Sequence, residues 1–180
     1  MSIASQLQYC FPSASDVTTQ GPTLLGHIAW LWSCSPLHAD WPCHLLQKQV
    51  VPALRHRQCL LVSDGQRPVA YAAWAWLNEP AQQRYLLHPH GLREGDWRSG
   101  PHLWWIDWVA PFGHTQAMAR WLKAHVFSTQ IARALRVKRN SSVGRVMDMH
   151  GDSVPWSERH LSQHQFVQQF QNLQTSEAWR

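Results

Sequence analysis

One carboxylate lies in the middle of an apolar, strand-forming segment. The segment runs from Leu103 to Val109 (LWWIDWV) and is followed by the turn-forming residues Pro111-Phe112-Gly113. Aromatic and β-branched residues favour a strand that packs on neighbours, but a carboxylate buried without a partner is costly. Asp107 should therefore have a specific partner, and the fold must bring a polar group from elsewhere in the chain against this strand.

A histidine is the best candidate for that partner. His38 follows Pro36 in a loop between two predicted helices. A histidine held by a buried aspartate is suited to act as a general base near neutral pH, so we predict that His38 and Asp107 form a catalytic pair. Each residue alone also has a structural interpretation, since a buried aspartate often binds a backbone or indole N–H.

Ser35 lies three residues before His38 and has three interpretations. It is a candidate nucleophile, a candidate oxyanion donor, or merely a residue at the end of a helix. The GxSxG motif of the nucleophile elbow does not surround it, which favours the third interpretation.

Composition limits the class of protein and of partner. The 180 residues fit one domain, and the net charge of +5 favours an acidic protein, a nucleic acid or an anionic membrane surface as partner. The twelve tryptophans indicate either an aromatic core or an apolar binding surface. The four cysteines lack the spacing of zinc ligands, and His88 and His90 lack a third ligand at regular spacing, so no metal site is predicted.

The sequence also predicts a compartment. No charged segment followed by an apolar segment resembles a signal peptide near Met1, and no run of 18 apolar residues is present. We expect a cytoplasmic protein with free thiols and without stable membrane insertion.

The first half of the chain predicts two helices and a hairpin. Residues 1–22 are expected to be a flexible tail. Apolar spacing predicts a helix over 23–35, with Thr23 as N-cap and Pro36 as its end, and a second helix that opens at Pro42 and is kinked or ended at Pro52. Strands are predicted over 58–63 and 67–77, joined at Asp64-Gly65, with a short strand over 84–87.

The second half predicts a strand over 103–109, a helix over 115–127, and strands over 132–137 and 145–149. A surface helix is expected over 157–173. This order indicates an α+β, mixed α/β fold with a central, mainly antiparallel sheet flanked by helices. We assign residues 23–152 to the main domain and residues 153–180 to a helical C-terminal extension of it.

Several blocks resemble the RTX-toxin-activating lysine acyltransferases over roughly residues 24–151. The first block lies in the helix predicted before His38, and the most specific block contains Asp107. The matching segments are Leu25 to Trp32, Ser35 to His38, Trp41-Pro42, Pro68 to Tyr71, Trp74-Ala75, Trp97, Ser99-Gly100, Leu103 to Gly113, Arg133 to Val137, Val143 to Val146 and His150-Gly151.

The resemblance implies a GNAT-like acyltransferase fold and a homodimer. It implies transfer of a fatty acyl chain from acyl carrier protein to internal lysines of an RTX protoxin in the cytoplasm, with no tightly bound cofactor. The family's essential histidine and aspartate fall on His38 and Asp107, and its conserved serine on Ser35. Gln49 stands where many members carry Asn. We expect either backbone N–H groups or Gln49 to donate to the oxyanion, and Gln49 is the candidate supporting residue.

Other features fit or oppose this expectation. The glycine-rich pyrophosphate loop of coenzyme A-dependent acetyltransferases is not visible, so coenzyme A is not expected to carry the acyl group. We expect the acidic carrier protein to bind the basic stretch Arg133 to Arg145. The tryptophans near 30–32, 74–76 and 104–108 have two interpretations: they line a slot for the acyl chain, or they fill the hydrophobic core. The alternative is a basic, Trp-rich binding module, either a nucleic-acid binder or a toxin escort, without catalysis.

Overall fold

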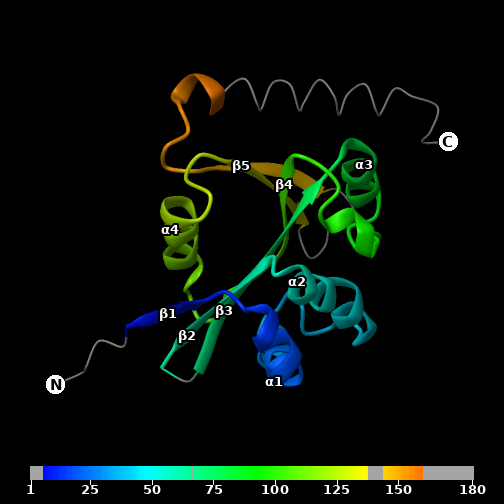
Figure 1. The fold of residues 1–180 in the computed structure, drawn as a ribbon, viewed down its shortest axis with the longest axis vertical. Helices are drawn as coiled ribbons and strands as arrows, with labels where there is room; N and C mark the ends of the chain where they lie inside the picture. Colours follow the sequence, from blue (N-terminus) through cyan, green and yellow to red (C-terminus); the bar gives the residue numbers. More distant parts are fainter. Residues whose placement is uncertain (1–5, 66, 138–143, 160–180) are drawn as a thin grey trace.

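Six strands form one sheet with the simplest possible neighbour order. A computed structural model describes residues 6–65, 67–137 and 144–159. The strands lie in the order β1-β2-β3-β4-β5-β6, and all neighbours are antiparallel except β4 and β5 (Figure 1). The predicted class, mixed α/β with a mainly antiparallel sheet flanked by helices, is confirmed, and the arrangement is compatible with the expected GNAT-like fold.

The strands match most of the sequence-based predictions. Their bounds are β1 Leu7–Cys10, β2 Cys59–Asp64, β3 Arg67–Leu77, β4 His102–Val109, β5 Ile131–Val137 and β6 Gly144–His150. The predicted hairpin between β2 and β3 is confirmed, with Gly65 at a φ of 61° that a side chain would disfavour. The parallel pairing of β4 with β5 requires a crossover, which helix α4 (Thr115–His125) provides.

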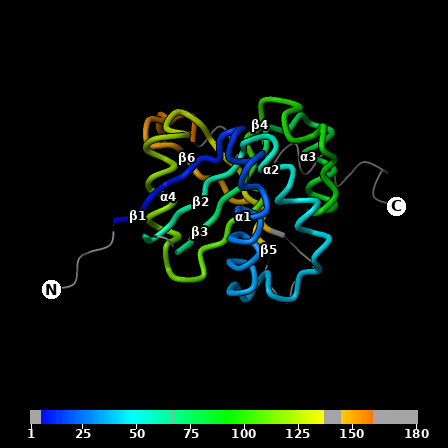
Figure 2. Tube along the Cα trace, turned by 60° about the horizontal axis from the view of Figure 1, so that its bottom comes forward, coloured from blue at the N-terminus to red at the C-terminus, as the bar shows by residue number. Residues whose placement is uncertain are grey.

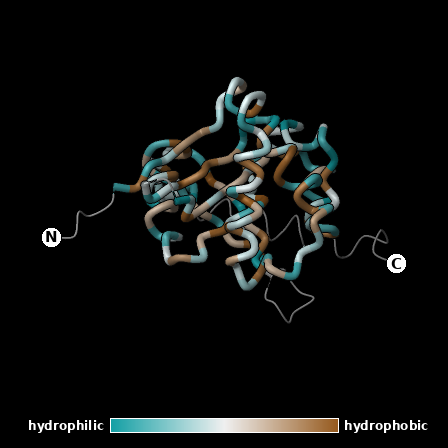
Figure 3. The backbone as a smooth tube through the Cα atoms, turned by 90° about the horizontal axis from the view of Figure 1, so that it is seen from below, coloured by the Kyte–Doolittle hydropathy of each residue, from teal (hydrophilic) through white to brown (hydrophobic). Residues whose placement is uncertain are grey.

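Helices cover both faces of the sheet. On one face lie α1 (Ala14–Ser33), the π-helical turn η1 (Leu46–Val50), α2 (Val51–His56), α3 (Glu79–Leu87) and the 3-10 turn η2 (Glu94–Trp97). Helix α4 lies on the opposite face, as the separation of α4 from α1 and α2 in Figures 1 and 2 shows. We call these the helical face and the α4 face. Figure 3 shows hydrophilic and hydrophobic stretches alternating along the helices, as expected for elements with one buried side.

Residues 7–22 differ from the expected flexible tail. Strand β1 pairs with β2, and α1 begins at Ala14 with Ser13 as its N-cap. The Ser13 hydroxyl accepts the Asp16 N–H and the Asp16 carboxylate accepts the Ser13 N–H, which is a capping box. Thr23 is therefore inside the helix rather than at its start, and Pro22 is also an interior residue.

The next two helical segments also differ in part from the predictions. The turn η1 continues directly into α2, and Pro52 lies at the first turn of α2, where its missing N–H is tolerated. The short strand expected over 84–87 is wrong, because these residues belong to α3. The Asn78 side chain caps α3 by accepting the Ala81 N–H, and Pro80 lies in its first turn. The expected helix over 157–173 lies mostly outside the described residues.

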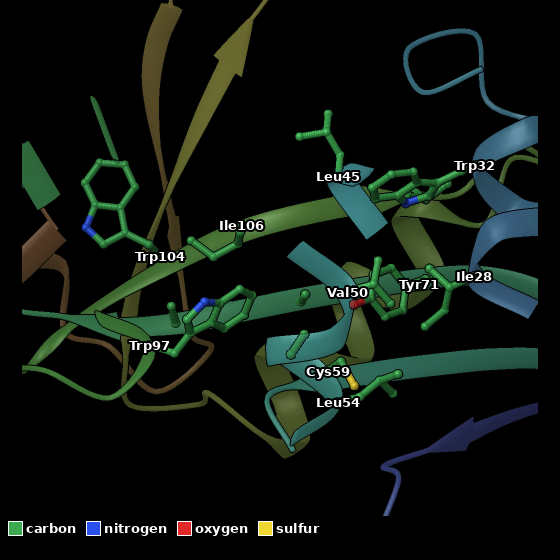
Figure 4. Packing of buried hydrophobic residues seen from close by; sticks show 14 of the residues in the cluster. Ile28, Trp32, Leu45, Val50, Leu54, Cys59, Tyr71, Trp97, Trp104 and Ile106 are labelled. Carbon is green, nitrogen blue, oxygen red and sulfur yellow. The ribbon is translucent and has the colours of Figure 1, made fainter. Parts of the chain in front are cut away.

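Two hydrophobic clusters divide the tryptophans between the faces. On the helical face, α1 buries Leu24, Ile28, Leu31 and Trp32 at helical spacing against β2, β3 and β4. Burial of each such aliphatic side chain stabilises the fold by about 1.5–3 kcal/mol. Figure 4 shows Trp32 and Tyr71 at one end of this cluster and Trp97 and Trp104 at the other. Trp74 and Trp105 pack on the α4 face, so the three tryptophan groups do not line one common slot.

A bulge in β4 decides which face Asp107 occupies. Asp107 pairs with Ala73 and Trp105 pairs with Trp74, which leaves Ile106 as an extra residue in β4. Strict alternation would place Asp107 on the α4 face, opposite to Ile106. The bulge puts Ile106 and Asp107 on the helical face together, where Asp107 meets residues of α1 and of the loop after it.

Candidate active site

His38 and Asp107 meet inside the protein, 69 positions apart in the chain. The His38 Nε2 lies 3.0 Å from the Asp107 Oδ1, and the two side chains are 2% and 1% exposed. This is the contact that the sequence analysis expected. Such close approach in a nearly water-free setting makes their electrostatic coupling stronger than it would be at the surface.

Each remaining polar atom of the pair has its own partner. The Trp32 indole N–H donates to the Asp107 Oδ2 over 2.9 Å, and the Ser35 Oγ lies 2.7 Å from the His38 Nδ1. A carboxylate accepts hydrogen bonds, so His38 donates from Nε2 and its lone pair is on Nδ1. The Ser35 hydroxyl therefore donates to Nδ1. The result is a linear relay, Ser35 to His38 to Asp107, with the order of a nucleophile, base and acid triad.

Local backbone turns bring Ser35 and His38 together. Helix α1 ends at Ser33, close to the end expected from Pro36, and the Ser35 N–H donates to the Trp32 carbonyl. The N–H groups of His38 and Ala39 then both donate to the Ser35 carbonyl at 3.0 and 2.9 Å. This tight turn holds the serine and histidine side chains on the same side, above Asp107.

Aromatic rings enclose the imidazole. The His38 ring centre lies 4.4 Å from that of Trp41 and 5.5 Å from that of Trp32. Trp41 is half-buried and packs against the helical-face cluster. The indoles of Trp32 and Trp41 therefore contribute to the burial of the His38 imidazole.

Gln49 lies in the turn η1 and is buried, 4% exposed. Among the described residues, no hydrogen bond joins Gln49 to His38 or Asp107. Instead, the Gln49 Nε2 is bonded to the Nδ1 of His90, whose ring lies edge-on to Trp41 with ring centres 4.9 Å apart. In the sequence, His90 stood out only as one histidine of an incomplete set of metal ligands. Nothing in the spacing of the sequence linked it to Gln49 or Trp41.

Tyr71 adds a second polar group on the same face. It lies two residues from Ala73, the register partner of Asp107, so its side chain shares the helical face with Asp107. Burial, with added effects of Cys59 and Asp107, raises the pKa of Tyr71 well above its ordinary value. Its buried hydroxyl has no hydrogen-bond partner among the described residues. Tyr71 is therefore a protonated donor close to the carboxylate.

The expected basic dock is only partly described. Lys138 and Arg139 lie outside the described residues. Arg133 is largely buried, with its Nε 3.9 Å from Asp148 and Nη1 bonded to Gln82, so it is not a solvent-facing docking group. Arg136 and Arg145 are exposed and face each other across β5 and β6.

The described residues contain neither a cluster of metal-ligating side chains nor a membrane-spanning helix. Among residues 6–65, 67–137 and 144–159, no three His, Cys, Asp or Glu side chains are grouped so that they could hold a metal ion. In the same part of the chain, every helix is too short or too polar to cross a bilayer.

Comparison with known proteins decides the family. The sequence model of the RTX toxin acyltransferase family matches residues 17–150. The chain belongs to this family. As a member of the RTX toxin acyltransferase family it is an acyltransferase, and the family match covers all of the residues that form the relay.

Individual relatives agree with the family match. The chain is 38% identical over 152 residues to the protein-lysine myristoyltransferase HlyC of Escherichia coli, covering 84% of this chain and 85% of that protein. It is 39% identical to the RTX-I toxin-activating lysine-acyltransferase ApxIC of Actinobacillus pleuropneumoniae, covering 74% and 77% of the two chains. It is 41% identical to the leukotoxin-activating lysine-acyltransferase LktC serotype A11 of Mannheimia haemolytica, covering 73% and 78%.

Proposed function

We propose that this acyltransferase moves a fatty acyl chain from acyl carrier protein to internal lysine side chains of an RTX protoxin and thereby activates it. The relatives are named as lysine acyltransferases that activate RTX toxins, which supports lysine as the acceptor. The single observation that carries the mechanism is the buried contact of 3.0 Å between His38 and Asp107. We expect the reaction in the cytoplasm and the enzyme as a homodimer, with no tightly bound cofactor.

Lysine must lose a proton before it can attack. Its ammonium has an ordinary pKa of about 10.4, so it is charged at neutral pH and carries no free lone pair. In the proposed reaction His38 Nδ1 takes one proton through the Ser35 hydroxyl, which passes on the proton that it receives from the ammonium. Asp107 stabilises the imidazolium that results.

The freed amine then completes the transfer. Its nitrogen bonds to the carbonyl carbon of the thioester, the carbon–sulfur bond breaks, and the thiolate takes the proton from the His38 imidazolium. The second proton of the nitrogen goes to solvent. The products are an amide, a thiol and one released proton, so charge and atoms balance.

The alternative of a basic, Trp-rich binding module finds less support. Single-stranded nucleic acids bind aromatic platforms at a surface groove. Trp32, Trp74, Trp97, Trp104 and Trp105 are instead buried, each 5% exposed or less. Those aromatic rings stabilise the fold and are not available to stack on bases.

Transfer is tested with the purified chain, a fatty acyl-acyl carrier protein and a protoxin fragment that contains the acceptor lysines. Intact mass of the fragment should rise by one or more acyl groups. His38→Ala should reduce the rate by at least about 100-fold, because general base catalysis contributes on the order of 10²–10⁴-fold. His88→Ala, an exposed histidine, is the matched control and should retain activity. Absence of acylated fragment with the unmodified chain would refute the proposed function.

The role of Ser35 is tested separately. If Ser35 passes a proton, enzyme mixed with the donor alone stays unacylated, and Ser35→Ala slows transfer without abolishing it. An acyl mass on a peptide that contains Ser35 would instead show a serine ester intermediate and would contradict the relay.

A further inference from the structure

The amide of Gln49 has one end used and one end free. Its Nε2 is bonded to His90, whereas its Oε1 is buried and has no hydrogen-bond partner among the described residues. Leaving a buried carbonyl oxygen without a hydrogen-bond partner is energetically costly. A native site that leaves such an atom unpaired is a candidate for binding a donor from a ligand.

Continuous side-chain contacts link this amide to the general-base candidate. His90 lies against Trp41, and Trp41 lies against His38, with ring centres 4.9 and 4.4 Å apart. Asp107 and His38 both act electrostatically on His90. Gln49 is therefore linked to His38 through His90 and Trp41, without a direct hydrogen bond to the relay.

The free end of the amide is an acceptor. Burial lowers the pKa of His90, and Lys48, His44 and His38 lower it further, against the opposing charge of Asp107. His90 is thus neutral at pH 7, and its Nδ1 can accept the Gln49 N–H. The remaining Oε1 suits an N–H donor, whereas a developing oxyanion would be repelled by it. The expected role of Gln49 as a donor to the oxyanion therefore does not fit this orientation.

We propose that Gln49 binds the amine of the incoming lysine through its free Oε1, and that His90 is a positioning residue that holds the amide in this orientation. The inference rests on the proposed lysine acyltransferase function and adds a lysine-binding group to it. One N–H of the lysine nitrogen donates to Gln49 while another proton leaves toward Ser35. The lone pair then points at the thioester carbon, as productive attack requires.

The fold keeps both residues in place. Gln49 lies within a π-helical turn, and such turns are frequent at functional sites. His90 lies in the loop between α3 and η2, and the Arg84 side chain closes this loop with two hydrogen bonds of 3.1 Å to Asp96. These hydrogen bonds therefore restrain the loop that carries His90.

The experiment separates lysine binding from donor binding. Gln49→Met keeps the length of the side chain and removes both amide atoms, and Gln47→Met changes an exposed glutamine in the same turn as a matched control. Initial rates are measured with the protoxin fragment varied at saturating acyl-acyl carrier protein, and then with the donor varied. We expect Gln49→Met to raise KM for the fragment about tenfold, corresponding to one hydrogen bond of roughly 1.4 kcal/mol, with KM for the donor unchanged.

Two further variants define the role. Gln49→Glu keeps an acceptor oxygen and should retain fragment KM within about threefold of the unmodified enzyme. His90→Leu should raise fragment KM as Gln49→Met does, while His88→Leu should not. The proposal is overturned if Gln49→Met matches Gln47→Met in fragment KM, or if it lowers kcat alone and Gln49→Glu abolishes turnover, which is the pattern of an oxyanion donor. The proposed function itself fails only if the unmodified enzyme acylates nothing.

Discussion

At the scale of single residues, the site depends on one carboxylate with two different duties. Asp107 accepts from His38 at Oδ1 and from Trp32 at Oδ2. The first contact supplies charge to the base, and the second fixes the plane of the carboxylate. His38 could be predicted as the partner of Asp107 because a histidine held by a buried aspartate is a common general base, and because the resemblance places the family's essential histidine and aspartate at these two positions. The Trp32 contribution could not, since an indole at helical spacing is also what a plain hydrophobic core requires.

Removal of the Trp32 N–H tests that second duty. Trp32→Phe keeps an aromatic ring and should lower the free energy of unfolding by about 1.5–3 kcal/mol, because a buried hydrogen bond to a charged group is lost. The carboxylate also loses one of the two contacts that orient it toward His38, so kcat should fall. Urea unfolding and initial rates of acyl transfer measure the two effects.

The control for this substitution is Trp108→Phe. Trp108 packs with Trp105 on the α4 face, away from the relay. Trp108→Phe should change stability without lowering kcat. Equal kcat values for Trp32→Phe and the unmodified enzyme would show that the indole serves packing only.

At the scale of elements, helices and strands with a clear local sequence pattern could be predicted, whereas features that depend on long-range pairing could not. Strands β2, β3 and β4 and helix α4 are close to the predicted ranges because their patterns are clear. The start of α1 was misplaced because Pro22 and the polar residues before it lack apolar periodicity, while the capping box at Ser13 was overlooked. The bulge at Ile106, which turns Asp107 to the helical face, depends on pairing with β3 and leaves no trace in the sequence.

The true start of α1 is testable with two substitutions. Ser13→Ala removes the N-cap and should lower the free energy of unfolding by about 1 kcal/mol. Thr23 is solvent-exposed and lies in the middle of α1, and Thr23→Ala introduces the best helix former there. This substitution should leave the free energy of unfolding unchanged or raise it by roughly 0.5 kcal/mol. Thermal unfolding of the pair measures this, and the reverse ranking would restore Thr23 as the cap.

At the scale of the whole molecule, hydrogen bonds of polar side chains hold the long connection between β3 and β4 against the rest of the fold. The Gln58 side chain donates from its Nε2 to the carbonyls of Trp74 and Trp97, and its Oε1 accepts from Arg98. Arg84 and Asp96 tie α3 to η2. The sequence predicted only a short strand over 84–87 in this connection, whereas these long-range contacts make residues 78–101 a structured part of the fold.

The Arg84–Asp96 ion pair should determine part of the dependence of the free energy of unfolding on acid pH. Burial tends to raise the pKa of Asp96, but hydrogen bonds from Arg84 and the Arg93 N–H, together with both charges, outweigh burial and lower it. A lowered carboxyl pKa contributes stability above the unfolded pKa of about 3.9, and this stability is lost as pH falls through the folded pKa. Asp96→Asn should therefore be less stable than the unmodified chain at pH 7, and the difference should shrink toward pH 3. Urea unfolding at several pH values checks this, and a difference that stays constant with pH would contradict it.

Because Asp107 also anchors the Trp32 indole, a descendant of this protein that lost its chemistry would still be selected to keep the acid for folding. Its presence in a newly sequenced genome is then a poor marker of a working enzyme. The His38 imidazole, which the proposed reaction requires as its base, is the more informative residue to inspect.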